Sequence, residues 1–272
     1  MKTIIAPTDF SEVAENACLY AARLAADIQA DLILLHAMEL PVGVGEYPIA
    51  DDFLDEEGME KSLATLKEKL LAAVDGKVRI RTKNILGYPG QEIKALCEAE
   101  KPFAVVIATH NSALDRFFMG SITVYSAKHL PYPVIVVPRH AKYQTIKRIA
   151  FASDLKDVYD VPAQEIKMIV KLFDAELDVF YVGKNEKVIN QTGVDNLLLT
   201  HRLAALNPQF RIVENKDIMA GIADLVKKYQ TDLLIIIPKK HGPFHKSQSK
   251  DFVFRSDVPV MAIHEYDLIP AS

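Results

Sequence analysis

The residues that could do chemistry in this sequence stand at the ends of short apolar segments. Three such segments, at 2–7, 31–37 and 103–109, have the continuous apolar pattern of buried strands. In open α/β sheets a ligand binds outside the carboxyl ends of the strands. The candidate ligand-contacting residues are therefore those at or just after these ends: Thr8, Asp9, His36, Ala37, Ala108, Thr109, His110 and Asn111.

The segment Gly120-Ser121-Ile122-Thr123 offers a second kind of chemistry, because it opens an expected helix near 121–130. A glycine lets backbone amides approach an anion, and a helix N-terminus with hydroxyl groups completes a phosphate site. Gly120, Ser121, Ile122 and Thr123 are therefore candidates for phosphate binding. The same residues would equally cap the helix, and both interpretations stay open.

Catalytic and metal-binding patterns do not emerge from the spacing. The serines lack the G-x-S-x-G pattern of a nucleophile elbow, and neither a Walker A motif nor a zinc signature occurs. His241 and His245 have a metal-like spacing, but Gly242-Pro243 between them favours a polar loop over a helix. The sequence therefore predicts a protein that is not an enzyme and holds no metal.

Composition narrows the class of protein further. The chain has 272 residues, 50% of them hydrophobic, which suits two domains with buried cores. A net charge of −4 gives no basic surface for nucleic acid, and no apolar run reaches the roughly 20 residues of a membrane span. Cys18 and Cys97 lie in apolar helical patterns, so we expect buried, reduced thiols in a cytoplasmic protein. The N-terminus starts directly with a strand pattern, which predicts no signal peptide.

The two halves of the chain repeat one pattern. Residues 2–9, KTIIAPTD, and residues 147–154, KRIAFASD, are both short apolar runs that end in a hydroxyl residue and an aspartate. Residues 132–137 and 258–263 close the two halves with similar apolar strands that follow a proline. One fold therefore has to explain both halves, and the differences between them become evidence about function.

Strands and helices alternate in both halves, which predicts an α/β protein with helices on both faces of a parallel sheet. We expect two tandem doubly wound domains, each with a five-stranded parallel sheet, at 1–141 and 146–268 on either side of a polar linker at 140–145. The expected strands are 2–7, 31–37, 78–86, 103–109, 134–138, 148–153, 177–182, 209–214, 232–237 and 259–264; the expected helices begin at Ser11 and cover 59–74, 90–100, 121–130, 161–173, 193–206 and 217–229.

The first half resembles the universal stress protein family. The resemblance covers nearly all of residues 1–138 and, more faintly, 147–264. It implies an adenine-nucleotide α-hydrolase-like fold, a stress-response role, and ATP or AMP as the candidate ligand in the first domain only. It also implies that the last strands of the two halves pair within the chain as an internal pseudo-dimer. The residues that carry it are Pro7-Thr8-Asp9-Phe10-Ser11, Leu34-Leu35-His36-Ala37, Ala108-Thr109-His110-Asn111, Gly120-Ser121 and Pro133-Val134-Ile135-Val136-Val137.

Nucleotide-binding members of the family carry G-x-x-G-x9-G-[ST] after the fourth strand, and this sequence departs from that pattern. Ala108 and Asn111 stand in place of the first two glycines, and the loop from Asn111 to Gly120 is one residue short. Asparagine tolerates a positive φ better than most residues, so the shortened loop is the larger change. In the second half, residues 238–247 contain no Gly-Ser pair. The departures predict weak nucleotide binding in the first domain and none in the second.

Asp9 has three interpretations. The resemblance implies contact with the adenine or ribose of a nucleotide, an Asx turn would start the following helix, and a phosphoacceptor would need an acidic cluster that is missing here. The chain is expected to be a nucleotide sensor or adaptor, with a ligand-free interaction scaffold and a slow adenine-nucleotide hydrolase as alternatives. An unidentified protein partner and a homodimer of two chains are further expectations, and Asp51-Asp52 would form part of a lid near the site.

Overall fold

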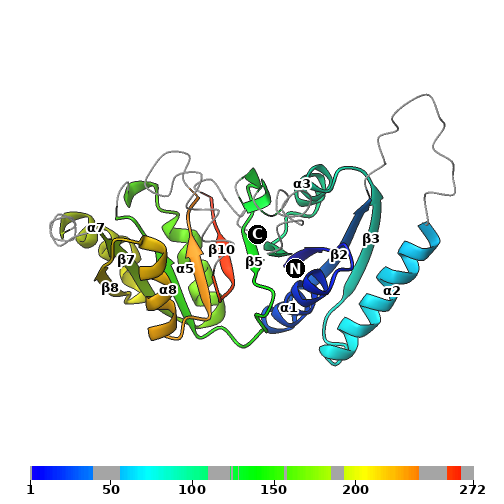
Figure 1. Ribbon diagram of the computed structural model, residues 1–272, viewed down its shortest axis with the longest axis horizontal. Coiled ribbons are helices and arrows are strands. Elements are labelled where there is room, and N and C mark those ends of the chain that lie inside the picture. The colour runs from blue at the N-terminus through cyan, green and yellow to red at the C-terminus, as the bar shows by residue number, and fades with distance from the viewer. Residues whose placement is uncertain are drawn as a thin grey trace. The chain divides into compact units, whose positions relative to one another are not determined.

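The structure is a computed structural model in which the chain divides into two compact units, Met1–Ala108 and Thr109–Ser272 (Figure 1). This division falls directly after the fourth strand. The domain boundary between 141 and 146 follows the sequence repeat and stays a prediction. No helix in the described ranges is both long and apolar enough to cross a membrane. The structure describes residues 2–38, 56–109, 123, 125–127, 129–155, 158–184, 193–238 and 256–264.

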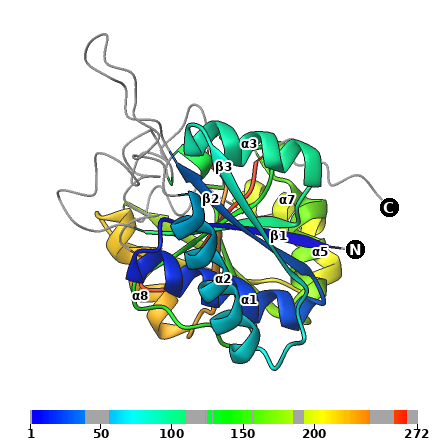
Figure 2. The same cartoon turned by 90° about the vertical axis from the view of Figure 1, so that its right-hand side faces the viewer.

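The first unit is built on four parallel strands in the order β3-β2-β1-β4. Helices α1 and α2 cover one face of this sheet, and α3 covers the other (Figure 2). Every residue of β1 and β4 is buried, which explains their continuous apolar pattern. The elements are β1 (Thr3–Pro7), α1 (Glu12–Ile28), β2 (Asp31–Met38), α2 (Glu56–Ala73), β3 (Ile80–Leu86), α3 (Pro89–Glu100) and β4 (Ala104–Ala108).

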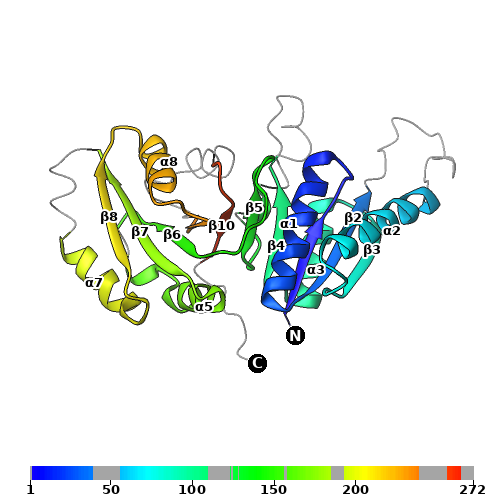
Figure 3. The ribbon, with the colours of Figure 1, turned by 90° about the horizontal axis from the view of Figure 1, so that it is seen from below.

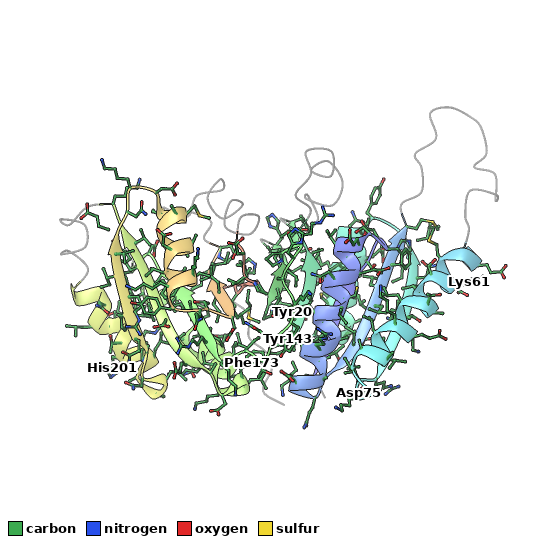
Figure 4. The ribbon with its side chains drawn as sticks, turned by 60° about the horizontal axis from the view of Figure 1, so that its bottom comes forward. Tyr20, Lys61, Asp75, Tyr143, Phe173 and His201 are labelled. Atoms are coloured by element: carbon green, nitrogen blue, oxygen red, sulfur yellow. The ribbon has the colours of Figure 1, made fainter. Side chains whose placement is uncertain are left out.

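Helix α1 starts and stops where its sequence dictates. Ser11 is the N-cap, as predicted, and its side chain accepts a hydrogen bond from the Ala14 amide at 3.3 Å. The helix ends at Gln29, which adopts a left-handed φ of 54°. Its buried face is rich in alanine, so the helix packs closely against the strands. Charged side chains such as Lys61 on α2 and Asp75 just beyond its end point away from the sheet (Figure 4).

The second unit contains six strands in the order β5-β10-β9-β6-β7-β8. Strands β6 to β10 are all parallel to their neighbours within that group, which confirms a five-stranded parallel sheet for the second repeat. Helix α8 lies on one face of this sheet, and α5 and α7 lie on the other (Figure 3). The elements are β5 (Val134–Val137), β6 (Arg148–Ala152), η3 (Val158–Asp160), α5 (Ala163–Phe173), β7 (Glu176–Gly183), α7 (Gly193–Leu203), η4 (Ala204–Leu206), β8 (Gln209–Glu214), α8 (Ile218–Lys228), β9 (Leu233–Ile236) and β10 (Val260–Ala262).

Strands β5 and β10 pair with each other, and they pair antiparallel. Val136 lies opposite Val260, and Ile135 lies opposite Met261. All four side chains are fully buried. The last strands of the two repeats therefore cover each other's apolar edges within one chain, which confirms the expected pseudo-dimer pairing.

Candidate functional site

The carboxyl end of β1 forms a tight turn that starts α1. The Thr8 amide donates to the Leu35 carbonyl at 2.8 Å, which extends the pairing with β2 by one residue. Thr8 Oγ1 then accepts a hydrogen bond from the Phe10 amide at 3.0 Å. Phe10 itself adopts a left-handed φ of 62°, which an L-residue seldom does without support from its surroundings. The Thr8 hydroxyl is thus part of the turn geometry rather than a free surface group.

Asp9 is exposed at the top of this turn and organises the start of α1. Its Oδ1 accepts from the Ser11 amide at 3.0 Å and from the Ser11 hydroxyl at 2.6 Å. These bonds define an Asx turn that orients the N-cap serine. The turn interpretation of Asp9 is confirmed, while its contact with a ligand stays a prediction.

His36 lies beside this turn on the neighbouring strand and is only 8% exposed. Its Nδ1 is 2.9 Å from the Thr8 carbonyl oxygen, and because a carbonyl only accepts, Nδ1 carries the proton. The Phe10 ring packs against the imidazole, with 4.7 Å between ring centroids. Ala37, the next residue, is half-buried. Thr8, Asp9, Phe10 and His36 therefore form one connected group at the sheet edge.

The two cysteines are buried free thiols, as expected. Burial raises the pKa of Cys18 to about 12, although a hydrogen bond from the Thr8 side chain acts in the opposite direction. Burial likewise raises the pKa of Cys97 to about 12, with a smaller contribution from Glu98. A thiol reacts as its thiolate, so neither cysteine is a nucleophile at neutral pH. The Cys18 thiol instead supports the turn through its hydrogen bond with the Thr8 side chain.

The remaining candidates fall in different parts of the chain. Ala108 is the buried last residue of β4 in the first unit. In the second unit, the Thr109 amide and hydroxyl donate to the Val137 carbonyl at 3.0 and 3.4 Å, and Thr123 is a fully buried helical residue. Both hydroxyl groups are therefore inside the protein. Residues outside the described ranges are His110, Asn111, Gly120, Ser121, Ile122, Asp51, Asp52, His241 and His245.

The second repeat contains the same turn with different side chains around it. The Ser153 amide donates to the Phe180 carbonyl at 3.0 Å, and Ser153 Oγ accepts from the Leu155 amide at 3.1 Å. Leu155 has a φ of 52°, close to that of Phe10. Tyr181 takes the place of His36, and burial, then the charge of Asp154, raise its pKa. The two repeats share the hydrogen-bonded turn, whereas the ring beside it is an imidazole in the first repeat and a phenol in the second.

Sequence patterns do not identify one residue that the structure brings to this edge. Asn84 on β3 lies opposite His36 in the β2–β3 register. Its Oδ1 is buried and has no hydrogen-bond partner among the described residues. An asparagine inside a strand is unusual, and that low strand propensity is the signal in the sequence that could have drawn attention to it. Within the described ranges, no cluster of three or more His, Cys, Asp or Glu side chains could hold a metal ion.

The fold and this sheet edge define a tandem doubly wound α/β protein with a structured strand-end turn in each repeat. The universal stress protein family profile matches residues 1–138. Universal stress protein MJ0531 from Methanocaldococcus jannaschii is 29% identical over 147 residues, which are 52% of this chain and 84% of that protein. The chain belongs to the universal stress protein family.

Solved structures are similar to this chain in fold over nearly its whole length. A universal stress protein from Archaeoglobus fulgidus is similar with a TM-score of 0.72 and 16% identity, covering 96% of each chain. A putative universal stress protein from Pseudomonas aeruginosa has a TM-score of 0.65 and 14% identity, covering 99% of this chain and 95% of its own. At these identities the likeness concerns the fold alone.

Proposed function

We propose that this chain is a stress-response nucleotide sensor or adaptor that binds ATP or AMP in its first repeat. The observation that carries the proposal is the structured edge at Thr8, Asp9 and His36, where a buried imidazole and a rigid turn support an exposed carboxylate. Such an edge is where doubly wound sheets bind their ligands. Preorganised polar groups of this kind lower the ordering cost of binding.

Each part of the site has a proposed role. Asp9 accepts hydrogen bonds from the ribose hydroxyls, and Ala37 with His36 flanks the base. The backbone near Gly120 and Ser121 holds the phosphates. The residues around this backbone are Ala108, Thr109, His110, Asn111, Ile122 and Thr123. Binding is weak, because the altered loop loses amide contacts that each contribute on the order of 1.5–3 kcal/mol to a charged group.

The second repeat serves as a structural partner rather than a second binding site. It keeps the turn at Ser153 but has lost the Gly-Ser pair that follows the fourth strand. In this proposal the two repeats correspond to domains at 1–141 and 146–268, in a cytoplasmic protein that acts through an unidentified protein partner and as a homodimer. Neither nucleic acid nor a membrane is a proposed partner. Nucleotide binding, not turnover, is the proposed activity.

A ligand-free scaffold is the second candidate function, and a slow adenine-nucleotide hydrolase is the third. Calorimetry with ATP and AMP on the purified chain separates the first two, together with mass spectrometry of any molecule that co-purifies. Release of ADP or AMP from ATP would favour the hydrolase.

Gly120→Val tests the location of the nucleotide. A branched side chain would occupy the phosphate position and restrict the backbone, so we expect binding to fall below detection. Gly242→Val in the second repeat is the matched control and should bind like the parent. If Gly120→Val binds as the parent does, or if nucleotide resides only in the second repeat, the proposed site is wrong.

A further inference from the structure

The alternation of side chains along β3 puts Asn84 on the same face of the sheet as His36. Arg81 and Lys83, on the same strand, both reach Glu100 at the end of α3, so these odd-numbered residues face α3. Side chains alternate along a strand, and Asn84 therefore faces the side covered by α1 and α2. Register partners in neighbouring strands share a face, which puts Asn84 beside His36.

The amide oxygen of Asn84 is in an unfavourable state unless something binds it. It is buried, and no hydrogen-bond partner exists for it within the described part of the chain. Buried acceptors in native proteins are nearly always paired, so an unpaired one calls for a specific explanation. His36 does not supply the missing donor: its Nδ1 donates to the Thr8 carbonyl, and no hydrogen bond joins its ring to Asn84 Oδ1.

The second repeat shows that the fold does not require an asparagine here. Tyr181 occupies the position of His36, and its register partner on β8 is Ile212. A β-branched apolar residue therefore suits this strand position, as strand propensity would favour. The first repeat instead has the polar Asn84 at this strand position. A difference of this kind, in the repeat proposed to bind nucleotide, points to a ligand contact rather than to folding.

Apolar surface lies next to the amide. Leu86 is two residues further along β3, on the same face as Asn84, and its side chain is 43% exposed at the carboxyl end of the strand. A half-buried carboxamide whose oxygen is buried, beside an exposed apolar side chain, suits a flat heterocycle that carries an amine donor. Carboxamides pair with the amine and adjacent ring nitrogen of adenine, using the oxygen as acceptor and the NH₂ as donor.

We propose that Asn84 is a specificity-determining residue that reads the amine edge of the nucleobase and so selects amino purines over oxo purines. The proposal rests on nucleotide binding by the first repeat and names the group that distinguishes one nucleotide from another. The bound base supplies the donor that Asn84 Oδ1 lacks, and Leu86 contacts the face or edge of the ring.

ATP and ITP test this directly, because they differ at the base edge in question: ATP has a 6-amine and an N1 acceptor, whereas ITP has a 6-oxo group and an N1–H donor. Calorimetry on the parent should show a preference for ATP of about tenfold or more, as expected for a paired carboxamide–base contact. Asn84→Ile copies the residue of the second repeat and should bring the two affinities within about twofold of each other. Thr82→Val, at an exposed position on the same strand and face, is the control and should keep the preference.

A second measurement uses the parent alone and does not depend on how the variant folds. The side-chain amide resonances of Asn84 should shift on addition of ATP and stay in place with ITP at equal occupancy. Equal binding of ATP and ITP by the parent, or a preference that survives in a folded Asn84→Ile, would refute the role of Asn84 while leaving nucleotide binding intact. Absence of binding by either nucleotide would reject the proposed function and this inference together.

Discussion

Thr8→Val tests whether the strand-end turn is held by a side-chain hydroxyl group. Thr8 is 4% exposed, its Oγ1 accepts from the Phe10 amide at 3.0 Å, and its hydroxyl interacts with the Cys18 thiol. Valine has nearly the same shape as threonine, so the change removes hydrogen bonds and little packing. The Phe10 amide then loses its partner, although its left-handed φ of 62° still has to be maintained.

The expected magnitude follows from these contacts. A neutral hydrogen bond contributes about 1 kcal/mol net, which corresponds to a factor of about 5 in an equilibrium constant. Phe10 is half-buried, so water partly replaces the lost acceptor, and we expect its amide hydrogen to exchange about fivefold faster. The fully buried Cys18 thiol loses its partner as well, which adds on the order of 1 kcal/mol to the loss of stability of the first unit.

Hydrogen exchange followed residue by residue is the suitable assay, because the chain contains its own control. The Leu155 amide is bonded to Ser153 Oγ in the equivalent turn and should exchange at its parental rate in Thr8→Val. Ser153→Ala should produce the opposite pattern: the Leu155 amide should exchange faster, and the Phe10 amide should exchange at its parental rate. Unchanged exchange of Phe10 in Thr8→Val, or equal acceleration at Leu155, would refute the idea that each hydroxyl holds its own turn.

Two further predictions concern stability. The hydrogen bonds and charge of Arg81, with Lys83 nearby, lower the pKa of Glu100. The ion pair therefore stabilises the fold above the pKa that Glu100 has in the unfolded chain, and this stabilisation is lost as pH falls through the lowered pKa. In denaturant unfolding, Glu100→Gln should be less stable than the parent at pH 7, with the difference closing toward pH 3, and a pH-independent difference would contradict this. Val136→Thr puts a hydroxyl group into the buried β5–β10 pairing and should cost about 1–3 kcal/mol, whereas the same change at the half-buried Val213 on β8 should cost clearly less.

Periodicity and capping residues predict most of the fold. The expected helix at 161–173 is observed as Ala163–Phe173, and the strand at 209–214 is observed at the same residues. The helix expected at 193–206 is divided, because its last turn tightens into the 3₁₀ segment Ala204–Leu206. The strand expected from 78 starts at Ile80, since it is an edge strand with a weaker pattern.

The site is less predictable, because its main features depend on register rather than on spacing. Strand ends draw attention to Thr8, Asp9 and His36, which the structure brings together. The bond between His36 and the Thr8 carbonyl, however, arises from two strands that pair one residue past the end of β1. Asn84 meets His36 only through the β2–β3 register, which hydrophobic periodicity leaves undetermined when a strand is partly polar on both faces.

The comparison of the two repeats separates what folding requires from what a ligand would require. Both turns have a hydroxyl residue at the strand end that accepts a hydrogen bond from the amide of a left-handed residue two positions later. The pairs are Thr8 with Phe10 and Ser153 with Leu155. Since the second repeat keeps this turn although it lacks the Gly-Ser pair, the turn belongs to the fold, and it leads directly into an α-helix only in the first repeat. The residues that differ beside it are the ring on the second strand, His36 against Tyr181, and its register partner, Asn84 against Ile212. Both changes make the first repeat more polar at the same edge, at the expense of a buried acceptor left unpaired within the described chain. In the function proposed above, the nucleobase would supply the donor that the Asn84 oxygen lacks, and no such donor is needed at Ile212 in the second repeat.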